Sequence, residues 1–254
     1  MITRSRTGLI LIIGALALTP PSPASALDGE ELIDQAAALA GGINGVDSPG
    51  FPITINRSGK YKLTGNLNPP NDKNAFNIDG DNVTLDLNGF RIVGGEIGIN
   101  AAAADGLTVI NGTIANFSSH GIRARTFAII QDMQITNNDG MGVWLNNNGR
   151  VLRSTITENN SVNIYCVSRC LIASNIVTGS KTESGIGLFT AAGGHLVLGN
   201  VIANNFIFGI YAEGPTGFGN NTLTGNNPGG ALGGTQIVGS VNNVHPNYCD
   251  PPCP

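Results

Sequence analysis

The feature that most constrains this chain is an internal repeat of about 21–25 residues, which runs from Val83 to about Asn220. The clearest copy spans residues 107–125, where two short apolar runs each end in a polar turn and a Gly-Ile pair begins the next run. A period of this length is typical of a stacked repeat, in which no single unit can bury its own apolar face.

Apolar residues recur in three rows when the repeats are aligned. The row that marks the Gly-Ile strand contains Ile99, Ile122, Val143, Ile164, Ile186 and Ile210. The second row contains Ile92, Ile114, Ile135, Ile156, Ile176, Val201 and Leu223. The third row lies around Leu85, Val109, Ile130, Leu152, Ile172 and Val197. Three short strands per turn predict an all-β fold, a three-sheet parallel β-helix of about seven or eight coils.

The composition agrees with a chain that turns often. It contains 36 Gly residues and only 12% charged residues, whereas the exposed faces of long helices usually carry many charges. Asn recurs at turns, as a row that we expect to stack from coil to coil: Asn116, Asn137, Asn159, Asn204 and Asn226. The net charge is −4, without blocks of Lys or Arg, so nucleic acid and anionic membranes are not expected partners.

Residues 1–26 have the pattern of a secretory signal peptide. Arg4 and Arg6 precede the short apolar run Leu9–Leu18, and small residues follow up to Ala26, where we expect cleavage. Ten apolar residues are too few to span a bilayer, so no membrane anchor is expected after processing. The mature protein is therefore predicted to be secreted, periplasmic or on the cell surface.

The mature chain divides into three predicted parts. Residues 27–50 form a capping helix and linker, with the helix over Asp28–Ala40, Asp28 as its cap, and Leu32, Ile33, Ala36 and Leu39 on one face. Residues 51–240 form the β-helix, and its first coil contains two short strands within Phe51–Leu67. Residues 241–254 form a C-terminal tail.

Four cysteines form two Cys-x-x-x-Cys pairs, Cys166 with Cys170 and Cys249 with Cys253. In an exported protein, two local disulfides are the favoured arrangement among the three that four cysteines allow. A metal site formed by His245, Cys249 and Cys253 is the alternative, but it lacks an evident fourth ligand. We therefore expect disulfides, no metal and no cofactor.

The segments Asn82–Ile92 and Asn111–Asn116 resemble the right-handed parallel β-helix proteins of the pectin-lyase-like superfamily, and the similarity covers about residues 51–240. This resemblance implies the fold but little about function, because the superfamily includes lyases, hydrolases, epimerases, tailspikes and adhesins. Other repeat types do not fit: calcium-binding Gly-Gly-x-Gly-x-Asp repeats, a hexapeptide period and the flat Thr-x-Thr rows of ice-binding solenoids are not expected here.

The catalytic carboxylates of the polygalacturonase-like members are missing. Ser119-His120-Gly121-Ile122 matches only the His-Gly element of their signatures. Hydrolysis by that route needs an acid and a base from carboxylates. The calcium site of a pectate lyase would need clustered carboxylates, whereas these are scattered: Asp86, Asp105, Asp132, Asp139 and Glu158.

Side chains alternate along a strand, so the residue after each Gly-Ile anchor should point outward. This outward row reads Asn100, Arg123, Trp144, Tyr165, Gly187 and Tyr211, and two places further on it reads Ala102, Arg125, Asn146, Val167, Phe189 and Glu213. Aromatic rings beside Arg side chains suit an acidic sugar chain. We predict a polysaccharide-binding surface, called here the aromatic stripe, made of Arg123, Arg125, Trp144, Tyr165 and Tyr211.

Three functions remain open at this point. The first is a non-catalytic, carbohydrate-associated protein that binds a polysaccharide along the aromatic stripe. The second is a polysaccharide lyase in which Tyr165 or His120 is the base and Arg123 neutralises a uronate. The third is a structural or adhesive surface module without glycan binding. For the aromatic stripe itself, the alternative to a binding surface is that a loop or the C-terminal tail covers the side chains as a small satellite core.

Overall fold

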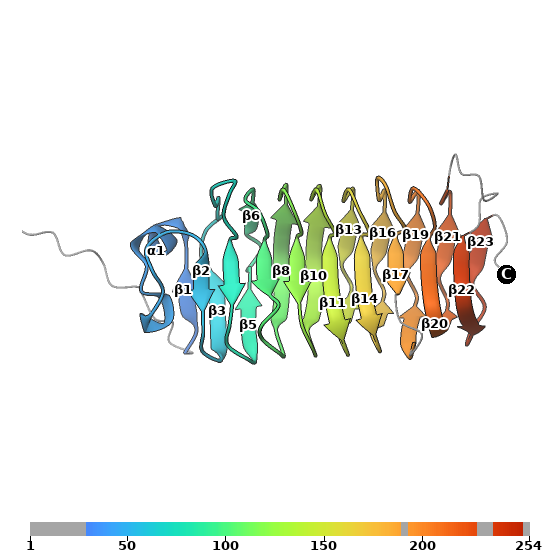
Figure 1. Cartoon of the computed structure of the whole chain (residues 1–254), viewed down its shortest axis with the longest axis horizontal. Helices are drawn as coiled ribbons and strands as arrows, with labels where there is room; N and C mark the ends of the chain where they lie inside the picture. The colour runs from blue at the N-terminus through green and yellow to red at the C-terminus, as the bar shows by residue number, and fades with distance from the viewer. Residues whose placement is uncertain (1–28, 189–192, 228–235, 251–254) are drawn as a thin grey trace, which may run out of the picture.

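Each strand pairs with the strand one coil further along the chain, and every pairing among the described residues is parallel. The structure is a computed structural model that describes residues 29–188, 193–227 and 236–250. The strands stack into a rod of about eight coils, with the N-terminal elements at one end and β22 and β23 at the other (Figure 1). The predicted parallel β-helix is confirmed.

The strands fall into three stacks that run along the rod. The first stack contains β2 (Ile53–Ile55), β4 (Phe76–Ile78), β7 (Ile99–Ala101), β9 (Ile122–Ala124), β11 (Val143–Asn147), β14 (Ile164–Ser168), β17 (Ile186–Leu188), β20 (Ile210–Gly219) and β22 (Ile237–Asn243). The second stack contains β6 (Arg91–Val93), the ends of β8 (Thr108–Ala115) and β10 (Ile129–Thr136), then β13 (Thr155–Thr157), β16 (Ile176–Thr178), β19 (Val201–Ala203), β21 (Thr222–Thr224) and β23 (Tyr248–Asp250). The third stack contains β1 (Glu31–Ile33), β3 (Gly59–Leu63), β5 (Val83–Asp86), the starts of β8 and β10, β12 (Arg150–Leu152), β15 (Leu171–Ala173), β18 (His195–Leu198) and the ends of β20 and β22.

The rod is filled by one continuous apolar core, to which each coil contributes inward side chains. All members of the predicted Gly-Ile row are fully buried, from Ile99 to Ile210. The other two rows were predicted correctly except at three positions. The inward residues there are Val151, Val177 and Ile202, and their neighbours Leu152, Ile176 and Val201 point outward.

These three errors share one physical reason. At each of them two adjacent residues are apolar, so alternation alone cannot decide which one faces the core. Stacking decides it, because Ile156 pairs with Val177 and Val177 pairs with Ile202 in the ladder. As a result Ile176 is 47% exposed and Val201 is 42% exposed.

Two coils of the second stack carry Thr at both outward positions, but they are not adjacent, so they do not form the continuous Thr-x-Thr rows that were not expected from the sequence. Thr155 and Thr157 flank the buried Ile156, and Thr222 and Thr224 flank the buried Leu223. Both flanking residues point outward in these coils, and on one side Thr136, Thr157 and Thr178 follow one another in successive coils.

The N-terminal cap differs from the predicted helix over Asp28–Ala40. Helix α1 is only Gln35–Ala40, and Asp34 caps it by accepting a hydrogen bond of 2.8 Å from the Ala37 N–H. Residues Glu31–Ile33 are instead extended, because they pair with Tyr61–Leu63 in the third stack. Leu39, expected on the apolar face, is 57% exposed. A short 3₁₀ turn, η1 (Ile43–Gly45), follows, and the two predicted strands of the first coil are β2 and β3.

The predicted Asn row mixes two different positions of the coil. Asn116, Asn137 and Asn204 have positive φ angles of 63°, 55° and 54°, a left-handed conformation that Asn tolerates better than most residues. Asn159 and Asn226 occupy the next position along the coil, and both are buried. The correct buried row is Asn138, Asn159, Ser180, Asn205 and Asn226.

This buried row, called here the inner ladder, links the coils through side-chain amides. Asn205 shows the pattern: its Nδ2 donates to Asn226 Oδ1 at 2.8 Å and to the Val177 carbonyl at 3.1 Å. Its Oδ1 accepts from the Ser180 N–H and from Asn163 Nδ2, both at 3.1 Å. A second ladder of the same kind runs through Ser154, Asn175, Asn200, Asn221 and Asn247. The side-chain amides therefore form hydrogen bonds with buried backbone N–H and C=O groups at the turns, where no neighbouring strand can pair with them.

The expected signal peptide lies outside the described residues, as do the last four residues of the tail. Within the described ranges, no helix is long and apolar enough to cross a membrane.

Replacing Asn205 by Ala should lower the free energy of unfolding by roughly 2–4 kcal/mol, because buried donors and acceptors on four neighbouring residues each lose a hydrogen bond. The matched control is Asn204→Gly at the adjacent left-handed corner, which should change it by less than about 0.5 kcal/mol, because glycine accepts this φ without strain. Urea denaturation followed by circular dichroism measures both. Equal effects of the two substitutions would contradict the inner ladder as a main source of stability.

Candidate functional site

The first stack places the predicted outward row in register across successive coils. Arg123 on β9 pairs with Trp144 on β11, and Trp144 pairs with Tyr165 on β14. Tyr165 pairs with Gly187, and Gly187 pairs with Tyr211 on β20. All four side chains are partly exposed, as the alternation predicts, because the residues on either side of each are buried.

Three rings and a cation pack against one another in the middle of this row. The His120 and Trp144 rings meet edge to face, with centroids 5.3 Å apart, and the Trp144 and Tyr165 rings do the same at 5.7 Å. The Arg123 guanidinium lies over the Trp144 ring, 4.5 Å from its centroid. Such a cation–π contact holds the guanidinium in place and leaves its N–H groups available to an anion.

The two arginines of the aromatic stripe differ in their surroundings. Arg125 forms an ion pair with Asp105 at 3.6 Å and donates to the Ala103 carbonyl at 3.4 Å, so its charge is already compensated. Among the residues described, Arg123 makes no ion pair. The structure thus brings Arg123, Trp144 and Tyr165 together and directs Arg125 toward the preceding coil.

Tyr211 lies two coils beyond Tyr165, with Gly187 between them, and it belongs to a separate aromatic pair. Its ring stacks on Phe208 with centroids 6.1 Å apart and an angle of 15° between the planes. Its hydroxyl donates to Glu213 Oε1 at 3.5 Å. The Glu213 carboxylate also acts on Tyr165, whose pKa is raised by burial and then by this negative charge.

Sequence reasoning placed Glu213 in the outward row but did not include it in the aromatic stripe, and it missed Phe208. Phe208 occupies the position before Gly209 that His120 occupies before Gly121, so both support an aromatic residue of the outward row. The repeat alignment contains the signal, because an aromatic ring or imidazole precedes the Gly of the Gly-Ile pair at both His120 and Phe208.

His120 is half-buried and poorly arranged for proton abstraction. Its Nδ1 accepts a hydrogen bond of 3.0 Å from the Met141 N–H. Burial, and then the nearby Arg123 charge, lower the pKa of His120, so the ring is neutral at neutral pH. A neutral ring that accepts at Nδ1 carries its proton on Nε2, so neither nitrogen is free to act as a base.

Tyr165, the other candidate base, is also unfavourably placed. Its raised pKa keeps the phenol protonated, whereas a general base works best with a pKa near the operating pH. Neither of the two candidate bases is therefore arranged to accept a proton in this structure.

A disulfide lies inside the rod beneath this surface. Cys166 and Cys170 are bonded to each other, and the buried His195 lies close by, with ligand atoms of all three within 4.8 Å. The two sulfur atoms are not available as thiolates while they are bonded to each other. Cys249 is also disulfide-bonded, so it cannot serve the alternative metal site with His245, and Cys253 lies outside the described residues.

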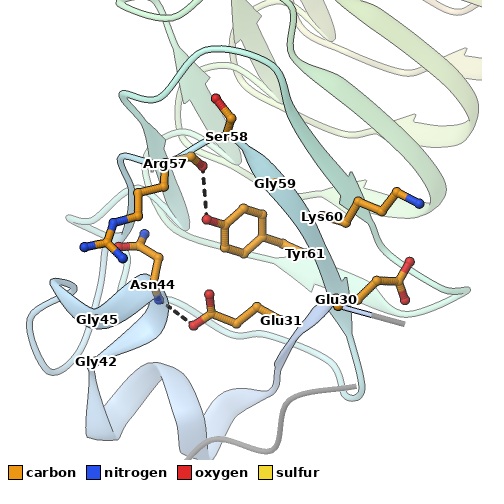
Figure 2. A pocket seen from close by; sticks show the side chains of 11 residues that line it. Glu30, Glu31, Gly42, Asn44, Gly45, Arg57, Ser58, Gly59, Lys60 and Tyr61 are labelled. Atoms are coloured by element: carbon orange, nitrogen blue, oxygen red, sulfur yellow. Dashed lines mark hydrogen bonds between the residues drawn. The ribbon is translucent and has the colours of Figure 1, made fainter. Parts of the chain in front are cut away.

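Two hollows lie away from the aromatic stripe. One, of about 500 Å³, is near the N-terminal cap (Figure 2), where Glu31 accepts from the Asn44 N–H and the Tyr61 hydroxyl donates to the Arg57 carbonyl at 3.0 Å. The other, of about 370 Å³, lies beside the third stack, and its lining includes Phe127, Arg150, Arg169, Leu171 and Leu196. Neither includes a residue of the predicted site.

The sequence profile of the family described as the right-handed β-helix region matches residues 97–247, more than half of the chain. The chain therefore belongs to this family, which confirms the expected resemblance and gives the rod its right-handed coil. No curated protein matches the sequence.

Solved structures share the fold at low sequence identity. A variant of the periplasmic alginate epimerase AlgG is 15% identical with a TM-score of 0.64, and the match covers 80% of this chain and 56% of that one. The A-module of the mannuronan C-5 epimerase AlgE4 from Azotobacter vinelandii is 13% identical with a TM-score of 0.59, over 86% and 66% of the two chains. The chain thus spans between about half and two thirds of these proteins, and the likeness establishes the fold alone.

Acid should destabilise the protein through His195, because burial lowers its pKa to about 4 from the usual 6.5. Between these pH values the unfolded state binds a proton that the folded state does not, so this contribution is complete above about pH 6.5 and is lost as pH falls toward 4. The loss amounts to about 3 kcal/mol. Urea denaturation at several pH values should show a weaker pH dependence for His195→Gln than for the wild type. His245→Gln, at an exposed position, is the matched control for the loss of one histidine.

Proposed function

We propose that the protein binds an acidic polysaccharide along the part of the aromatic stripe formed by Arg123, Trp144 and Tyr165. The observation that carries this proposal is the Arg123 guanidinium, which is held on the Trp144 ring and has no ion pair among the described residues. A fixed, uncompensated guanidinium on a chain of net charge −4 is an anion-binding group, and a carboxylate fits its planar fork.

The neighbouring groups suit a sugar rather than a small inorganic anion. Partly exposed rings of Tyr165 and Tyr211 border the row, and the Tyr211 hydroxyl and Glu213 can exchange hydrogen bonds with sugar hydroxyls. The row continues across several coils, so an extended chain can contact it in register. The structural neighbours support this class of ligand, since two of them are named as epimerases of alginate and of mannuronan.

Binding without catalysis is the function that this geometry supports best. Both nitrogens of His120 are occupied, and the phenol of Tyr165 stays protonated. A polysaccharide lyase acting on uronates therefore lacks a ready base in this arrangement. A polysaccharide ligand also agrees with the signal peptide expected at residues 1–26, which would place the protein in the periplasm or outside the cell.

Replacing Arg123 by Gln should weaken binding to a polyuronate about tenfold or more, because the charge-assisted hydrogen bonds to the sugar carboxylate are lost. Arg150→Gln is the matched control: it removes the same charge from an exposed position on another stack and should bind like the wild type. Affinity electrophoresis in gels containing polymannuronate or polygalacturonate, with a neutral β-glucan as reference, measures the binding.

The other functions have distinct results in the same experiment. Equal weakening by both substitutions would mean that net charge, not the site, attracts the polyuronate. If the wild type is retarded by neither acidic nor neutral glycans, the structural or adhesive role replaces this proposal. Ultraviolet absorbance from unsaturated products, abolished by Arg123→Gln, would establish the lyase instead.

A further inference from the structure

The second stack pairs in regular register over six successive coils. In six successive coils its central residue is fully buried: Ile114, Ile135, Ile156, Val177, Ile202 and Leu223. The residues on either side of each must therefore point outward. They form two parallel rows: Thr113, Gln134, Thr155, Ile176, Val201 and Thr222 in one, and Ala115, Thr136, Thr157, Thr178, Ala203 and Thr224 in the other. Ala115 and Ala203 are themselves buried, so ten of these twelve residues are accessible to solvent.

This surface, called here the threonine face, differs in composition from a usual protein surface. Seven of its twelve residues are Thr, four are aliphatic, one is Gln, and none is charged. The aliphatic Ile176 and Val201 are 47% and 42% exposed. The face thus combines hydroxyl and methyl groups and offers no charge to a polyelectrolyte partner.

The spacing of the threonine face is the same in every coil. The pairings between its strands run without a register shift. Neighbouring strands of a parallel sheet lie about 4.8 Å apart, and residues i and i+2 of a strand lie about 6.6 Å apart. The twelve positions therefore lie on a nearly rectangular net, of which ten are accessible to solvent. Four of the strands that carry it, β13, β16, β19 and β21, follow one another along the rod in Figure 1.

A surface that repeats in two directions is complementary to a partner that also repeats in two directions. A soluble protein or a flexible glycan would meet the same contacts at every coil, which would not fix a single register. A solid lattice can match all coils at once. The absence of charge matters here, because charged groups orient the surrounding water strongly. Thr hydroxyls, in contrast, can join an ordered water layer, and the methyl groups beside them limit the other positions that water can take.

We propose that the threonine face binds ice, with its hydroxyl groups anchoring water at positions that continue the crystal lattice. The Thr157 hydroxyl donates to the Thr136 hydroxyl at 3.2 Å, which shows two hydroxyls of neighbouring coils aligned along the row. This activity is independent of the aromatic stripe, because the two surfaces lie on different stacks of the rod.

Fluorescently labelled protein should be incorporated into a slowly growing ice hemisphere and should shape ice crystals in a nanolitre osmometer. Thr157→Lys puts a long charged side chain in the middle of the threonine face, so incorporation and shaping should both be lost. Thr108→Lys makes the same change at an outward position of the third stack, and it should behave like the wild type. Thermal melting by circular dichroism verifies that both variants are folded.

Exclusion of the labelled wild type from ice would overturn the proposal, as would equal loss in Thr157→Lys and Thr108→Lys. If Thr157→Lys unfolds, Thr157→Val serves in its place, because it keeps shape and strand preference while removing one hydroxyl. That variant should reduce ice shaping, and unchanged shaping would contradict the role of the hydroxyl row. Polyuronate binding should be unaffected by any of these changes.

Discussion

Everything in this protein depends on parallel pairing between equivalent strands of successive coils. Each coil buries its inward residues only because another coil lies above and below it, so stability is shared along the rod. The same pairing places equivalent side chains one above another. Inside the rod this arrangement produces the continuous core and the two amide ladders, and outside it produces surfaces that extend over many coils.

The two surfaces show how one scaffold supports different chemistry. On the first stack the outward residues change from coil to coil, and Arg123, Trp144 and Tyr165 form a local arrangement suited to an anionic ligand. On the second stack the outward residues are mostly Thr and aliphatic residues, and the result is a face without charge. When the outward residues of a stack differ between coils, they can form a local site. When similar residues recur at the same positions in successive coils, they form an extended, regularly spaced surface.

The corners of each coil explain the abundance of Gly and Asn. Positions such as Asn137 and Asn204 adopt positive φ, and the following residue turns inward with its amide buried. The two roles sit side by side in pairs such as Asn137-Asn138 and Asn204-Asn205, where both residues are identical. Alignment of the sequence alone therefore assigned some asparagines to the wrong role, because composition does not distinguish an exposed corner from a buried amide.

The sequence by itself determined the architecture, the Gly-Ile row of the core and the outward row of the site, because a repeat whose Ile and Gly residues alternate with polar ones permits only one orientation. It could not orient strands such as Ile176-Val177 and Val201-Ile202, in which both faces are apolar. Only the tertiary structure decided those, through the register of the neighbouring coils, and it thereby revealed the threonine face. It likewise decided that Arg123 is unpaired among the described residues while Arg125 meets Asp105, since ion pairs between coils depend on positions that are remote in the chain.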